Sequence, residues 1–125
     1  MLLNIFIIIF TTLRITIHQF LSLKKSYIMA KFGELISFEK PVLIDFYTDL
    51  EDSGNMIEIL RSVAASLGDT AKVIKIDIKK NEILADALRV KGNPTFMIYK
   101  NGQMQWRQTG FQEASTLVGL VKEYI

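Results

Sequence analysis

The stretch from Pro41 to Leu60 constrains the fold most, because two hydrophobic periodicities meet within it. Residues 42–47 are apolar except for Asp45, which is typical of a strand that is covered on both faces. From Met56 onward the apolar side chains recur at helical spacing. Residues 49–54, between the two patterns, are rich in side chains that cap helix N-termini. The stretch therefore predicts a buried strand, a short turn and an amphipathic helix.

The same periodicities predict the remaining elements. Two strands that flank a helix favour a parallel pair with a right-handed crossover, and Asn101-Gly102 is a strong signal for an antiparallel hairpin. The expected fold class is α/β, with a mixed four- to five-stranded sheet sandwiched between helices. In chain order we expect a helix over residues 31–39, a strand over 42–47, a helix over 56–67, a strand over 71–78, a short helix over 81–89, strands over 95–100 and 103–108, and a helix over 113–124.

Several segments occur in an order that matches one known family. They are Pro41–Tyr47, Val73–Asp77, Val90–Thr95, Phe96–Gly102 and Gly110. Together they resemble the thioredoxin family over residues 31–125, apart from the first short strand of the family pattern. The resemblance implies the thioredoxin fold, with Pro94 as the family's cis-proline. In that family the cis-proline loop faces the redox turn and lines a groove that holds an extended peptide.

The redox motif of that family, Trp-Cys-Gly-Pro-Cys, is absent, because the chain contains no cysteine. Counted from the first strand, the lost thiol positions fall at Glu51 and Gly54. Counted back from the helix, they fall at Leu50 and Ser53, and both registers stay open. Disulfide exchange needs an attacking thiolate and a second thiol that resolves the mixed disulfide. Neither register supplies a sulfur nucleophile.

The acidic side chains of the turn have a structural interpretation. Glu51 and Asp52 lie at the predicted helix N-terminus, where the helix dipole favours negative charge. The alternative is an acidic patch that recognises a basic peptide. A metal site is not expected, because Asp49, Glu51 and Asp52 lack both histidine partners and the spacing of a metal-binding loop.

Asp45 and Lys75 form a second pair implied by the resemblance. In the family, a buried acid at this strand position and a lysine on the neighbouring strand help to move protons for the second thiol. In a chain without thiols there is no group for this pair to protonate or deprotonate. A buried carboxylate costs several kcal/mol unless it is paired. We expect Asp45 and Lys75 to be an ion-paired structural relic, and the alternative is a partly hydrated carboxyl group with a raised pKa.

Residues 1–28 precede the predicted domain, which we place at residues 29–125. Leu2–Leu13 is mostly apolar but shorter than the ~20 residues that span a membrane, and Arg14 follows it. Three interpretations stay open. The segment is an upstream extension of a domain that starts at Met29, a membrane-associated N-terminus, or a cleaved signal segment.

The charge and the missing motifs argue against several classes of function. Three of the 15 basic residues precede Met29 and all 13 acidic residues follow it, so residues 29–125 carry a net charge near −1 and give no case for nucleic-acid binding. The sequence has no phosphate-binding loop and no Gly-x-Ser-x-Gly motif, and His18 is its only histidine. We expect no cofactor and no metal.

The leading hypothesis is a redox-inactive binding module that holds an extended peptide or protein segment. The expected groove lies between residues 50–54 and Asn93-Pro94-Thr95, flanked by Gly110 and Phe111. One alternative is a thiol-disulfide oxidoreductase of cell redox homeostasis, as the family resemblance suggests. The other is a membrane-tethered structural domain. The expected location is cytoplasmic, or membrane-anchored or exported if residues 1–28 are genuine.

Overall fold

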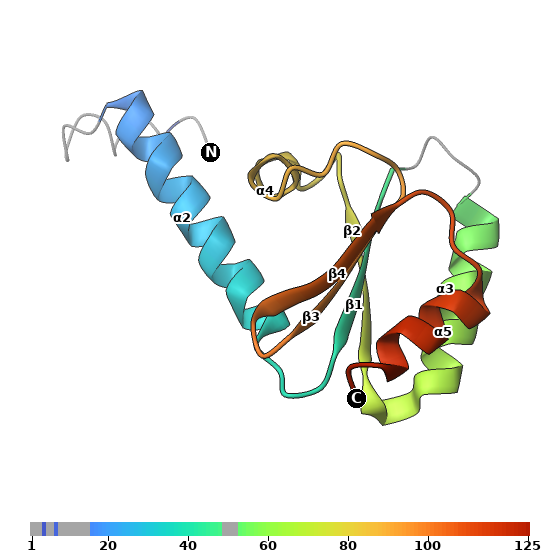
Figure 1. Cartoon of the computed structure of the whole chain (residues 1–125). Helices are drawn as coiled ribbons and strands as arrows, with labels where there is room; N and C mark the ends of the chain where they lie inside the picture. Colours follow the sequence, from blue (N-terminus) through green and yellow to red (C-terminus); the bar gives the residue numbers. More distant parts are fainter. Residues whose placement is uncertain (1–3, 5–6, 8–15, 49–52) are drawn as a thin grey trace.

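The structure is a computed structural model, which describes Asn4, Ile7, residues 16–48 and residues 53–125 (Figure 1). The described elements alternate between helices and strands before they end in a hairpin and a helix. They are α2 (Ile17–Ile36), β1 (Val42–Tyr47), α3 (Ser53–Leu67), the 3₁₀ helix η1 (Gly68–Thr70), β2 (Lys72–Asp77), α4 (Glu82–Ala87), β3 (Thr95–Lys100), β4 (Gln103–Thr109) and α5 (Ala114–Lys122).

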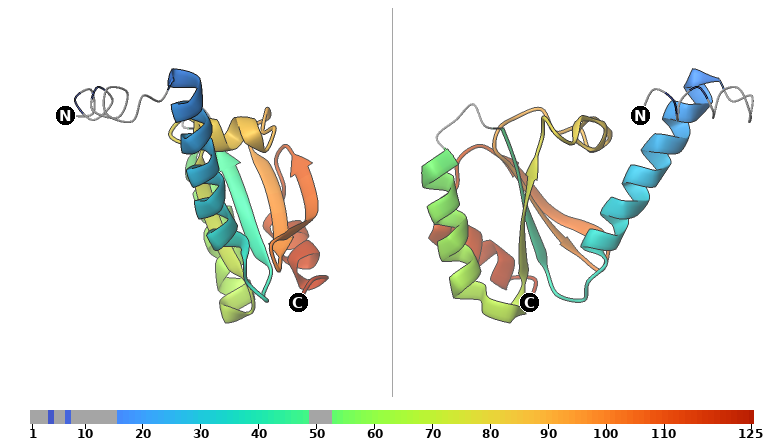
Figure 2. Two further views of the ribbon diagram at one scale, coloured as in Figure 1. Left: turned by 90° about the vertical axis from the view of Figure 1, so that its left-hand side faces the viewer. Right: turned by 180° about the vertical axis from the view of Figure 1, so that it is seen from behind.

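The four described strands form one mixed sheet in the order β2-β1-β3-β4. β1 pairs parallel with β2 and antiparallel with β3, and β3 pairs antiparallel with β4. Helices α2 and α4 lie on one face of the sheet, and α3 and α5 lie on the other (Figures 1 and 2). This is the α/β sandwich that the sequence predicts.

The core has two halves because side chains alternate between the faces of the central strands. From β1, Val42, Ile44 and Phe46 pack with residues of α2 and α4. Leu43 points to the opposite face and packs with residues of α3 and α5. Each fully buried large apolar side chain stabilises the fold by roughly 1.5–3 kcal/mol. Asp45 has the same parity as Leu43 and therefore belongs to the α3/α5 face.

The central strands agree closely with the sequence prediction. β1 and β3 have the predicted bounds, and β2 and β4 differ from theirs by one residue at their ends. The turn between β3 and β4 has positive φ at Asn101 (54°) and Gly102 (79°), as the favoured two-residue hairpin turn requires.

The first helix differs from the prediction, which was wrong about where it begins. α2 begins at Ile17 instead of residue 31 and ends at Ile36. Its start is fixed by a capping box, in which the Gln19 N–H donates to Thr16 Oγ1 (3.2 Å) and the Thr16 N–H donates to Gln19 Oε1 (2.9 Å). α2 therefore runs through the boundary proposed between residues 28 and 29, and that boundary stays a prediction.

Only the C-terminal half of α2 packs against the sheet. Phe32 and Ile36 are buried in the core, and Ile28 and Met29 are partly buried beside it. The N-terminal half extends beyond the sheet and away from the rest of the domain (Figures 1 and 2). No helix in the described part of the chain has the length and hydrophobicity that are needed to cross a membrane.

Candidate functional site

Residues 92–95 form the loop that leads into β3, and the bond between Asn93 and Pro94 is cis. Pro94 is buried, Asn93 is half-buried and Thr95 is fully buried. Thr95 Oγ1 donates to the carbonyl of Gly92 (2.6 Å). A Cβ at Gly92 would lie 2.0 Å from Thr109 Cγ2, so the loop leaves no room for a side chain there. The conformation of the loop is therefore fixed by close packing against the end of β4.

The side chain of Asn93 ties this loop to the end of β1. The Thr48 N–H donates to Asn93 Oδ1 (3.1 Å), and Asn93 Nδ2 donates to Thr48 Oγ1 (2.7 Å). Thr48 directly precedes the turn in which the family carries its cysteines. Asn93 is predicted from the sequence and Thr48 is not, because no local signal links residues 45 positions apart.

Gly110 also contacts the Asn93–Pro94 loop. Its N–H donates to the carbonyl of Pro94 (2.8 Å), and its φ of 107° is one that L side chains rarely adopt. Phe111, the next residue, is 57% exposed. The structure thus brings Asn93, Pro94, Thr95 and Gly110 together and leaves a large apolar ring on the surface beside them.

The other wall of the expected groove is only partly described. Leu50, Glu51 and Asp52 lie outside the described residues, and α3 begins at Ser53 and contains Gly54. The choice between the two registers for the lost cysteines stays a prediction. Within residues 16–48 and 53–125, no group of three or more His, Cys, Asp or Glu is arranged to hold a metal ion.

Asp45 lies on β1, three residues before Thr48, and its side chain is buried. It is 1% exposed, and neither carboxylate oxygen has a hydrogen-bond partner among the described residues. Lys75 is its neighbour across the β1–β2 register, but the Lys75 side chain is exposed and its Nζ lies 5.9 Å from the centroid of the Tyr47 ring. The expected ion pair is therefore not formed, because a long lysine on an edge strand reaches solvent.

Burial sets the chemistry of Asp45. Desolvation raises the pKa of Asp45 from 3.8 to about 7, and the positive charge of Lys75 opposes that rise. This matches the second interpretation of the sequence in one respect, because the pKa is raised. Asp45 is thus able to hold a proton near neutral pH.

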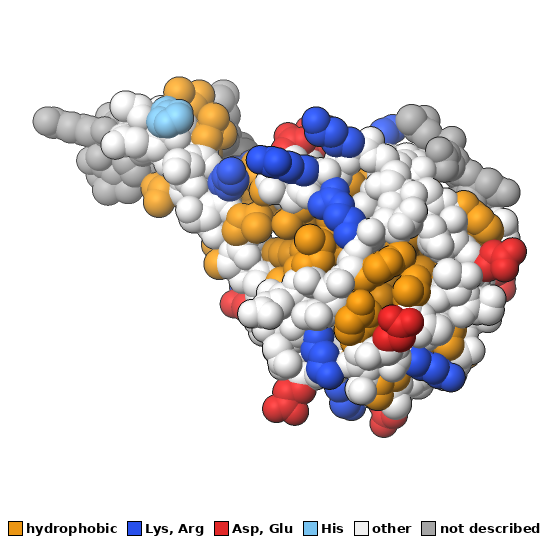
Figure 3. Space-filling view, in the orientation of Figure 1, with side chains coloured by type: hydrophobic (Ala, Val, Ile, Leu, Met, Phe, Trp, Pro, Cys, Tyr) orange, Lys and Arg blue, Asp and Glu red, His pale blue; other side chains and the backbone are white. Residues whose placement is uncertain are grey.

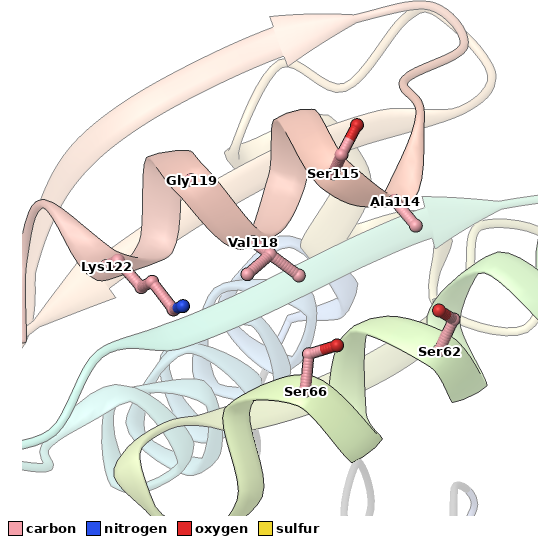
Figure 4. Close-up of a pocket in the computed structure, with 7 residues that line it drawn as sticks. All are labelled: Ser62, Ser66, Ala114, Ser115, Val118, Gly119 and Lys122. Carbon is pink, nitrogen blue, oxygen red and sulfur yellow. The ribbon is translucent and has the colours of Figure 1, made fainter.

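A separate depression lies between α3 and α5 (Figure 4). It combines three hydroxyl groups with one ammonium group, and none of the candidate site residues lines it. The depression is lined by Ser62, Ser66, Ala114, Ser115, Val118, Gly119 and Lys122.

Comparisons with known proteins agree with this architecture. The sequence model of the family described as Thioredoxin matches residues 24–123. "Thioredoxin Y, chloroplastic" from Oryza sativa subsp. japonica is 38% identical over 96 residues, which cover 75% of this chain and 57% of the rice protein. "Thioredoxin-like protein slr0233" from Synechocystis is 32% identical over 107 residues, which cover 84% of this chain and 100% of that protein.

Solved structures give the same result. A mutant thioredoxin from Halobacterium salinarum is 32% identical and superposes with a TM-score of 0.66, covering 76% of this chain and 83% of that one. The chain spans little more than half the length of the rice relative, and the cytoplasmic location expected from the sequence stays a prediction. The fold, the strand order and the match over residues 24–123 together establish that this cysteine-free chain belongs to the thioredoxin family.

Proposed function

We propose that this chain is a redox-inactive thioredoxin-family domain that binds an extended peptide or protein segment beside the Asn93–Pro94 loop. One observation carries the proposal. Three contacts hold the loop in place: the hydrogen bonds to Thr48, the hydrogen bond from Gly110, and the packing of Gly92 on Thr109. They are present although the chain has no cysteine.

The redox part of the proposal rests on the chemistry of exchange. Thiol–disulfide exchange proceeds by attack of a thiolate on a disulfide sulfur, and a mixed disulfide must then be resolved by a second thiol. None of the 125 residues is a cysteine, so this chain supplies neither group. A partner's own thiols would have to perform every step.

The proposed peptide binding depends on backbone groups of the loop that have no partner among the described residues. The Asn93 side chain is occupied by Thr48, but no hydrogen bond to the Asn93 backbone N–H or C=O is found among the described residues. An extended segment can pair with such backbone groups as an added strand, which requires no cysteine. The exposed Phe111 ring offers an apolar contact next to that strand. The recognised ligand is therefore an extended backbone with an apolar side chain facing Phe111.

A peptide selection followed by calorimetry tests the proposal. Peptides that bind the full chain would be selected from a random displayed library and titrated against wild type and Phe111→Ala. We expect Phe111→Ala to cost more than about 1 kcal/mol of binding free energy, the cost typical of a central contact. The matched control is Met104→Ala, which truncates another exposed apolar side chain at the opposite end of β4.

The outcomes separate clearly. Weaker binding by Phe111→Ala with unchanged binding by Met104→Ala supports the loop as the binding site. Equal affinities for wild type and Phe111→Ala, or a library that yields no binding peptide, would overturn the proposal.

A further inference from the structure

The N-terminal half of α2 exposes apolar side chains that the domain does not cover. Ile17, Leu21, Leu23 and Tyr27 have exposed fractions between 51% and 66%. Figure 3 shows hydrophobic side chains and the histidine gathered on this projecting part of the helix. Exposed apolar side chains that gather on one element mark a site of interaction with protein or with a membrane. This segment therefore needs a partner that the described residues do not supply.

The charged residues that precede Glu34 in the sequence are all basic. They are Arg14, Lys24, Lys25 and Lys31, of which Lys31 forms an ion pair with Glu34 (3.8 Å). Lys24 and Lys25 lie one turn from Leu21 along the helix, so their ammonium groups flank the apolar surface. Long lysine side chains can bury their methylene stems while the charged ends stay in a polar layer. The partner should therefore combine an apolar interior with a negatively charged surface.

We propose that the projecting half of α2 binds the surface of an anionic lipid bilayer. Residues 2–13, which precede it, are mostly apolar in sequence. This apolar stretch is shorter than the ~20 residues that span a membrane. Binding of a helix at a membrane surface strengthens with the apolar area it buries and with the attraction of its basic residues to anionic lipids.

Charge complementarity favours lipid over a second copy of the chain. Two α2 helices packed through this half would bring Lys24 and Lys25 of one copy against those of the other. The same half offers no Asp or Glu to compensate them, since Glu34 is the first acidic residue. Like charges brought together in this way are destabilising. The bilayer proposal is independent of peptide binding at the Asn93–Pro94 loop.

Vesicle flotation of the full chain tests the inference. Vesicles of phosphatidylcholine alone would be compared with vesicles that also contain phosphatidylserine, in low and in high salt. We expect binding to the anionic vesicles that weakens as salt is raised. Lys24→Gln with Lys25→Gln should lower the partition coefficient about 30-fold, from the typical contribution of each basic residue near an anionic surface.

A matched control and an apolar variant keep the test decisive. Lys79→Gln with Lys80→Gln removes another pair of consecutive, exposed lysines and should leave the partition coefficient unchanged. Leu21→Ser with Leu23→Ser changes only exposed side chains and should also weaken binding.

Three results would overturn the inference. They are no flotation with anionic vesicles, equal losses in both lysine pairs, and a dimer in light scattering that forms through α2 without any binding to vesicles.

Discussion

Asp45→Asn is the substitution for which the structure predicts the sharpest effect on stability. The Asp45 carboxyl is 1% exposed, has no hydrogen-bond partner among the described residues and has a pKa raised to about 7 by burial. In the unfolded chain its pKa returns to its ordinary value of 3.8. Between these two values the folded state binds a proton that the unfolded state releases. The contribution of Asp45 to stability is therefore fully present below the unfolded pKa and is lost as pH rises through about 7.

The size of the effect follows from the two pKa values. With a pKa of 3.8 in the unfolded chain and about 7 in the folded one, the free energy of unfolding falls by roughly 2.5 kcal/mol between pH ~5 and pH ~8. Asparagine has nearly the same shape and does not ionise. Asp45→Asn should therefore remove this loss and leave a variant that is more stable than wild type at the upper pH.

Urea denaturation at both pH values measures the difference directly. The matched control is Asp77→Asn, because Asp77 is also buried on a strand but its Oδ1 accepts from the N–H groups of Lys79 (2.9 Å) and Lys80 (3.4 Å). Asp77→Asn should keep the loss of stability between the two pH values. The same pH dependence in Asp45→Asn as in wild type would show that burial of Asp45 does not cause the loss of stability.

Two further pairs of substitutions test the packing. Gly92→Ala places a Cβ 2.0 Å from Thr109 Cγ2 and should lower the free energy of unfolding, measured by chemical denaturation, by about 1–3 kcal/mol. Its control is Gly119→Ala in α5, where a Cβ meets nothing within 4 Å and should stabilise the fold by roughly 0.5–1 kcal/mol. Leu117→Ala empties a fully buried position and should cost about 2–5 kcal/mol, whereas Leu35→Ala, on the exposed side of α2, should change stability by less than about 1 kcal/mol. Similar losses within either pair would contradict the burial and packing described above.

The central strands were predictable because their signal is local. Residues 42–47 and 95–100 are nearly continuous apolar runs bounded by turn residues, and both form strands with those bounds. The start of α2 was also within reach, since Thr16 and Gln19 form the sequence pattern of a capping box. The prediction missed it because it placed the beginning of the domain at Met29.

The candidate site was only partly predictable because its contacts are distant in sequence. Asn93 and Pro94 could be named from the resemblance, but the hydrogen bonds from Asn93 to Thr48 depend on the fold. The same limit explains the error about Lys75. Register alone places it beside Asp45, whereas the position of β2 at the sheet edge lets its side chain leave for solvent.

The measurement that tests the central claim most directly is a dithiothreitol-coupled insulin-reduction assay on the full chain, run beside a thioredoxin with an intact redox motif. Because the chain has no cysteine, we predict no rate above the buffer blank. A clear rate from cysteine-free protein of confirmed mass would contradict the account, since it would require disulfide reduction without a thiol in the chain.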